Sequence, residues 1–164
     1  MTSTQHTRRS HRGPRGQALA EFALILPILL GMVGGGIDFA RVFQGSMTLQ
    51  TATRNGAEAA AYSPASIDLA TAQATARTTV CTEAQHLPGF VPGPGGVVAT
   101  CTNPTVVVTA FNRSTVAPAN VKYPLVTVTV TTTLAFELTF PWPLLPDGGW
   151  DVGTTQSFSI MQGR

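Results

Sequence analysis

Residues 15–62 read RGQALAEFALILPILLGMVGGGIDFARVFQGSMTLQTATRNGAEAAAY, an apolar segment followed by an Ala-rich one. The segment from Phe22 to Ile37 carries no charge. At 1.5 Å per helical residue it covers about 24 Å, and the longer segment from Gln17 to Ile37 covers about 31 Å. The longer segment matches the roughly 30 Å hydrocarbon core of a bilayer. We therefore expect a single transmembrane helix that includes one acid, Glu21, near its N-terminal end.

The helical pattern continues beyond the apolar segment. No proline interrupts residues 28–63, and small or apolar side chains recur at helical spacing over residues 49–60. We expect one helix over residues 17–62, whose second half is a stalk with a small-residue face for packing. Gly31 and the triple glycine at 34–36 have two open interpretations, which are close helix–helix contact and a flexible hinge.

The N-terminal tail predicts the orientation of the span. Residues 1–16 hold four arginines and no acid, whereas the rest of the chain holds six basic and eight acidic residues. By the positive-inside rule, the tail is a basic cytoplasmic leader and the C-terminal part is extracytoplasmic. Three other interpretations of the apolar segment stay open: a cleaved secretory signal peptide, a twin-arginine export signal suggested by Arg8-Arg9, and a buried core helix.

Residues 63–164 predict a region of mixed secondary structure. A helix is expected over about 67–83, with Ser63-Pro64 or Ser66 as its cap and Asp68 in its first turn. β-Branched residues bounded by turn signals then predict four strands. These strands cover residues 97–101, 105–111, 125–140 and 153–161.

The longest of these strands defines the sheet. Its valines at 126, 128 and 130 alternate with threonines at 127, 129 and 131, and Phe136 and Leu138 keep the parity of the valines. This alternation predicts an antiparallel sheet with one buried and one wet face. The predicted fold class is α+β, in which a long N-terminal transmembrane helix continues into an extracytoplasmic stalk that packs on a small antiparallel β-sheet. The predicted domains are the leader (1–16), the transmembrane and stalk helix (17–62) and an extracytoplasmic α+β domain (63–164).

The composition argues against an enzyme and against a nucleic-acid-binding protein. Charged residues make up 11% of the chain and the net charge is +2, with the excess of basic residues in the leader. His86 is the one histidine beyond the leader, and no spacing of histidine and cysteine matches a zinc site. No glycine-rich loop has the context of a phosphate-binding loop. We expect no catalysis, no cofactor, no metal, no nucleic acid and no small-molecule substrate.

Cys81 and Cys101 are the two cysteines of the chain. If this part of the chain lies outside the cytoplasm, a disulfide is their natural use. In the chain-entropy model, closing a loop of this size stabilises the fold by roughly 3 kcal/mol. Two free buried thiols are the alternative.

Glu21 is the candidate functional carboxylate. A carboxylate within an apolar segment is costly in lipid, and it usually marks a partner or a function. The alternative is a hydrated side chain at the headgroup boundary, close to Arg15.

Residues 15–62 closely resemble the TadE-like family of tight-adherence pilus proteins. The resemblance lies in Arg15-Gly16, in Glu21-Phe22 and in the proline that follows an aliphatic run. It continues after the apolar segment in a pattern of one acid, one arginine and an Ala-rich stretch. The residues of that second part are Asp38, Arg41, Arg54, Ala57 and Ala59.

The resemblance implies a pilin-like fold and a role as a minor pseudopilin-like component of a tight-adherence (Flp, type IVb-like) pilus. It implies cleavage by a prepilin peptidase between Gly16 and Gln17, because Glu21 is then the fifth residue of a mature chain that keeps 148 of the 164 residues. The new α-amine of one subunit would pair with Glu21 of a neighbour, where lipid strengthens the attraction. The implied partners are the membrane, other pilus or pseudopilin subunits, the inner-membrane assembly platform and the peptidase. The alternative function is a membrane-anchored extracytoplasmic β-rich binding module outside any pilus.

Overall fold

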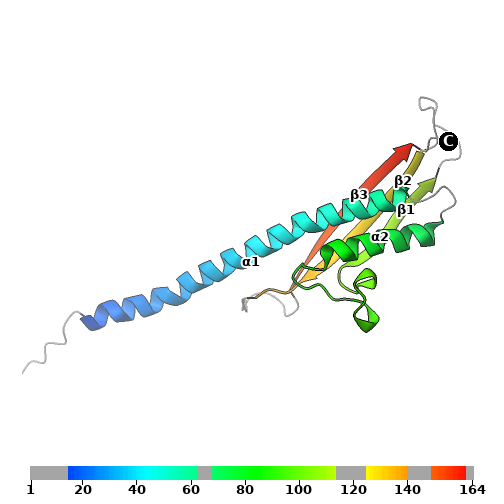
Figure 1. The fold of residues 1–164 in the computed structure, drawn as a ribbon. Coiled ribbons are helices and arrows are strands. Elements are labelled where there is room, and N and C mark those ends of the chain that lie inside the picture. Colours follow the sequence, from blue (N-terminus) through cyan, green and yellow to red (C-terminus); the bar gives the residue numbers. More distant parts are fainter. Residues whose placement is uncertain (1–14, 63–67, 114–124, 140–148, 162–164) are drawn as a thin grey trace, which may run out of the picture. The chain divides into compact units, whose positions relative to one another are not determined.

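A computed structural model describes residues 15–62, 68–113, 125–139 and 149–161 of the chain. The chain divides into two compact units, Met1–Ile37 and Asp38–Arg164. The main elements are two helices and three strands, with two short 3₁₀ helices between α2 and β1 (Figure 1). Their bounds are α1 (Arg15–Tyr62), α2 (Leu69–Ala84), η1 (Pro94–Gly96), η2 (Val98–Thr100), β1 (Thr105–Arg113), β2 (Leu125–Phe136) and β3 (Trp150–Met161).

The long N-terminal helix is present as the sequence predicted. α1 begins at Arg15, two residues before the expected Gln17, and ends at the expected Tyr62. Pro27 lies inside it. Because proline has no backbone N–H, α1 lacks one backbone hydrogen bond at this position, and the helix continues on both sides of it.

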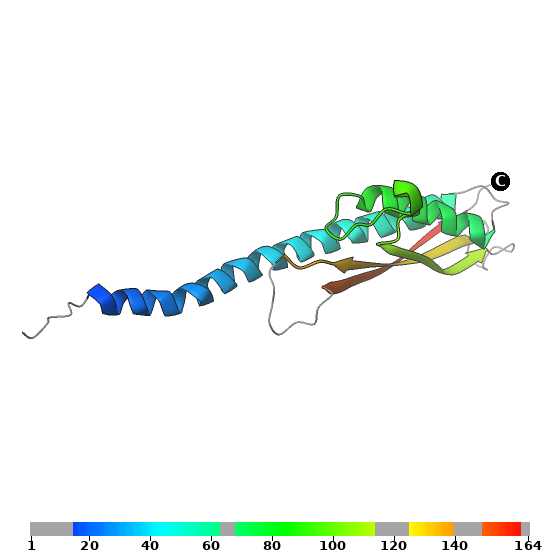
Figure 2. The same ribbon diagram turned by 90° about the horizontal axis from the view of Figure 1, so that it is seen from below.

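The C-terminal unit contains a three-stranded antiparallel sheet in the order β1-β2-β3. In the central strand, Val128 pairs with Phe111 of β1 and with Phe158 of β3. The register of β1 against β2 shifts between Val108 and Ala110. Figure 2 shows α2 and the later part of α1 on one face of this sheet. The predicted fold class, α+β with a long apolar helix and a small antiparallel sheet, is confirmed.

Two of the predicted strands are wrong in part or in whole. Residues 97–101 do not form a strand, because Val98–Thr100 is a 3₁₀ helix in which the Cys101 N–H donates to the Val98 carbonyl at 3.2 Å. The backbone N–H groups of Thr100 and Cys101 thus donate hydrogen bonds within this segment and not to a neighbouring strand. The expected strand over 125–140 ends at Phe136, and Leu138 lies beyond it in a half-buried position.

The start of α2 also differs from the prediction. Asp68 is the N-cap itself, and its carboxylate accepts hydrogen bonds from the Thr71 N–H at 2.9 Å and from the Thr71 hydroxyl at 2.8 Å. The backbone bond and then the hydroxyl bond lower the pKa of Asp68 below its ordinary value, since both favour the ionised form. The expected caps, Ser63-Pro64 and Ser66, lie outside the described residues.

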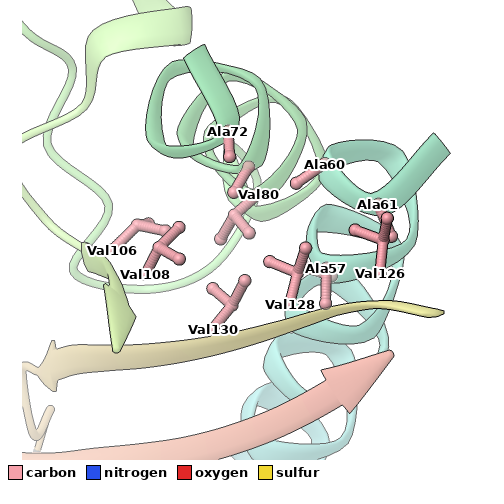
Figure 3. Close-up of a cluster of buried hydrophobic side chains, with 12 residues drawn as sticks. Ala57, Ala60, Ala61, Ala72, Val80, Val106, Val108, Val126, Val128 and Val130 are labelled. Carbon is pink, nitrogen blue, oxygen red and sulfur yellow. The ribbon is translucent and has the colours of Figure 1, made fainter. Parts of the chain in front are cut away.

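The core places small side chains of both helices against the valines of the sheet (Figure 3). Val126, Val128 and Val130 are at most 3% exposed, as their parity predicted. Gly56 lies where α1 meets α2, and a Cβ there would come within 2.6 Å of Val80 Cγ2. The small residues therefore let two helices lie close together on one sheet face. The helical members of the cluster are Ala52, Ala57, Ala60, Ala61, Ala72, Ala76 and Val80.

A second cluster joins α1 to the end of β2. Leu49, Leu134 and Phe136 are each at most 1% exposed. Gly45 of α1 lies under the Phe136 ring, and a Cβ at that position would overlap the ring atoms. Glycine is thus required here by close approach, although it weakens a helix by roughly 1 kcal/mol relative to alanine.

We expect Gly45→Ala to lower the free energy of unfolding by about 1–3 kcal/mol, because the overpacked ring cannot move freely in a filled core. Phe136→Leu should recover part of this loss in the Gly45→Ala background, yet it should destabilise the wild-type chain. Chemical denaturation of the four proteins, followed by circular dichroism, gives the coupling. Additive effects of the two changes would contradict the contact.

Candidate site for membrane insertion and subunit contact

The N-terminal unit presents large apolar side chains. Between Leu19 and Ile37 they are largely exposed, with Leu24 75% and Met32 71% exposed. By its length and composition, α1 is able to cross a membrane. Exposed apolar surface on this scale is unfavourable in water and favourable in hydrocarbon.

Glu21 and the residues of the predicted cleavage site lie in the first turns of α1. The Gln17 side-chain amide donates a hydrogen bond to Glu21 Oε1 at 3.2 Å. Gly16 is exposed, and a Cβ built there would meet nothing within 4 Å outside its own helical surroundings. Among the described residues, packing therefore requires glycine at Gly45 and Gly56 but not at Gly16.

A polar cluster connects α1 to the segment that follows β2. Asp38 is only 5% exposed, and its Oδ1 accepts a hydrogen bond from the Thr139 N–H at 3.1 Å. Arg41 Nη1 lies 3.9 Å from the same oxygen and also donates to the Thr139 hydroxyl. We call Asp38, Arg41 and Thr139 the polar clamp. In the polar clamp, Arg41 places a positive charge beside the buried carboxylate of Asp38. The hydrogen bonds of Thr139 join the segment after β2 to α1.

The face of the sheet away from the helices carries a ladder of hydroxyl groups. Each rung joins a threonine of β2 to a serine or threonine of β3, with oxygen–oxygen distances of 2.8–3.0 Å. This is the wet face that the alternation of valine and threonine predicted. The rungs are Thr127–Ser159, Thr129–Ser157 and Thr131–Thr155.

The two cysteines form a disulfide that ties α2 to the segment before β1. The Cα atoms of Cys81 and Cys101 lie 5.6 Å apart, and both side chains are at most 1% exposed. The pairing that the sequence favoured over two free thiols is therefore the one in the structure. Within the described ranges, no three histidine, cysteine, aspartate or glutamate side chains are grouped so as to hold a metal ion.

Sequence reasoning missed two contacts of this unit. Gln73 of α2 donates from its amide to the Val106 carbonyl at 2.7 Å and accepts from the Val108 N–H at 2.5 Å, so it binds the backbone of the edge strand β1. The contact of Asp38 with Thr139 was also missed. Both contacts join residues that are far apart in the sequence, so no local sequence pattern predicts them.

These features define an α+β protein whose N-terminal apolar helix is able to cross a membrane. Residues 16–58 match the family described as TadE-like protein, in agreement with the resemblance that the motifs indicated. The match includes Gly16, Glu21, Asp38 and Arg41, and it ends before α2 and the sheet. No curated protein and no solved structure matches the chain.

Proposed function

We propose that this protein is a minor pseudopilin-like component in the assembly of a tight-adherence (Flp, type IVb-like) pilus. The observation that carries the proposal is the TadE-like match over residues 16–58, which coincides with an exposed apolar helix that leads into a folded domain. The role is structural, without catalysis or cofactor. Its partners are other pilus or pseudopilin subunits and the inner-membrane assembly platform.

The proposed topology places the N-terminus in the cytoplasm and residues 63–164 outside it, with one span in the cell membrane. Two independent features support this orientation. The arginines of the leader precede the span, in agreement with the positive-inside rule. The Cys81–Cys101 disulfide lies in the C-terminal unit, and disulfides persist in oxidising compartments outside the cytoplasm.

The proposed maturation is cleavage between Gly16 and Gln17 by a prepilin peptidase. Gly16 is exposed, and a Cβ there would meet no atom of the described residues within 4 Å outside its own helical surroundings, so a glycine at this position suits an enzyme that must approach the backbone closely. Glu21 then pairs with the new α-amine of a neighbouring subunit. Among the described side chains, the neutral amide of Gln17 donates a hydrogen bond to Glu21, and this contact does not compensate its charge.

The hydroxyl ladder favours the second candidate function, a membrane-anchored binding module outside any pilus. Each hydroxyl group of this face has a donor and two acceptor lone pairs, so beyond its bond across the strands it offers further hydrogen bonds to a polar surface. The two functions differ in their need for Glu21. A binding module needs the span only as a membrane anchor, whereas the proposed pilus role needs Glu21 to pair with a neighbouring subunit.

The test is the variant Glu21→Ala in a host that assembles the pilus. Removing the carboxylate makes the segment more apolar, so we expect normal amounts of the protein in the membrane and a marked loss of surface filaments. Asp151→Ala, which removes an exposed carboxylate on β3, is the matched control and should leave filament numbers unchanged. Filaments are counted by electron microscopy. Wild-type numbers with Glu21→Ala would count against the pilus role and favour the anchored module.

A further inference from the structure

The first turns of α1 in the C-terminal unit have an inverted polarity. Asp38 is buried in the polar clamp and its partner Arg41 is partly covered. Phe39, Phe43 and Met47 are instead 71%, 53% and 55% exposed. On a helix of a water-soluble domain, charged groups face the solvent and aromatic groups face the core. The inversion indicates that the surroundings of this exposed side are apolar.

We call Phe39, Phe43 and Met47 the outer ridge. They follow one another at intervals of four residues and so lie on one side of the helix. The rings of Phe39 and Phe43 stack, with centroids 6.4 Å apart. Between Phe39 and Met47, Gln44 is an exposed polar residue, and the side chain of Arg41 is 42% exposed beside the polar clamp.

The apolar character of this side ends abruptly after Met47. The next exposed side chains at helical spacing are Gln50, Thr51 and Arg54, all of them polar. The change from apolar to polar takes about one helical turn, or about 5 Å along the axis. A boundary between hydrocarbon and water has this kind of sharpness, with a headgroup layer between them.

The length of the charge-free segment points to the same boundary. With Glu21 at the inner headgroup boundary, residues 22–37 cover about 24 Å and fall about 6 Å short of a bilayer core. Four more residues, up to Arg41, supply the missing length. Their two charged side chains, Asp38 and Arg41, contact each other and Thr139, which lowers the cost of placing them at this depth.

We propose that lipid surrounds the outer ridge and that the boundary between the bilayer and water lies between Met47 and Gln50. This inference rests on the proposed function, since it requires that α1 spans a bilayer. Lipid is favoured over the helix of another subunit because large exposed apolar side chains recur along α1 from Leu19 to Met47 and polar ones follow.

The test uses the full-length protein in phosphatidylcholine nanodiscs, with a bimane label on one introduced cysteine. Cys81 and Cys101 are bonded to each other, so an added cysteine is the one free thiol. The test variants are Phe43→Cys and Met47→Cys, and the references are Leu29→Cys in the apolar segment and Thr51→Cys beyond the ridge. Each label is quenched in turn by a nitroxide on the lipid acyl chain and by aqueous iodide.

We expect the labels at 43 and 47 to be quenched by the lipid nitroxide and to be better protected from iodide than the label at 51, with the label at 29 as the fully lipid-exposed reference. The label at 51 should show the reverse. Iodide quenching at both 43 and 47, with lipid quenching kept at 29, would overturn the inference and leave the outer ridge as a surface for a protein partner. Iodide quenching at 29 itself would contradict the membrane span, and with it the proposed function.

Discussion

Replacing Val128 with aspartate is expected to abolish the folded state of the C-terminal unit. Val128 is 0% exposed at the centre of the middle strand, and it packs in the cluster of alanines from α1 and α2. An aspartate there would be a buried charge without a partner. We expect a loss of at least about 4 kcal/mol in the free energy of unfolding, a large part of the 5–15 kcal/mol that stabilises a typical domain. Denaturant unfolding followed by circular dichroism measures this loss.

The matched control makes the same substitution on the other face of the sheet. Val107 of β1 is 46% exposed. Val107→Asp should cost about 1 kcal/mol or less, because the charge stays hydrated and the loss is one of strand propensity. Equal effects at the two positions would contradict the one-sided burial of the sheet.

The second large effect is expected from Gly16→Leu. If a prepilin peptidase cuts after Gly16, a side chain at this position should crowd the scissile bond and block processing almost completely. The helix itself should tolerate the change, since a Cβ at Gly16 meets nothing within 4 Å. The unprocessed variant would accumulate in the membrane with its leader attached. Mass spectrometry of the membrane-extracted protein gives the result.

Gly13→Leu is the control for this experiment. It places the same side chain in the same leader, three residues before the proposed cut, and it should leave processing intact. Processing of Gly16→Leu to the wild-type extent would argue that the peptidase does not act at this bond.

The regular parts of the fold were predictable from the sequence because their side-chain patterns are local. The alternation of valine and threonine in β2 has the period of two that a half-buried strand requires, and the valines are the buried set. The helix over 17–62 was predicted to within two residues of α1, since an apolar segment runs directly into an Ala-rich one without a proline between them.

The parts that were missed depend on contacts between distant residues. Residues 97–101 have the β-branched composition of a strand, yet no strand of the described chain pairs with them and Cys101 is held to α2 by the disulfide. The family pattern drew attention to Asp38 and Arg41 but did not identify Thr139 as their partner. The sequence motifs thus identified Asp38 and Arg41 as residues of the candidate site. Their contact with Thr139 could be seen only in the three-dimensional structure.

The N-terminus of the mature protein distinguishes a processed pseudopilin from a plain membrane anchor. The measurement is the intact mass, with sequencing of the N-terminal peptide, of the wild-type protein extracted from the envelope of a host that has the pilus system and its prepilin peptidase. We predict a chain that begins at Gln17, keeps 148 of the 164 residues and retains the Cys81–Cys101 disulfide. A chain that still carries the arginine-rich leader would contradict the pseudopilin role and leave the protein as a membrane-anchored module.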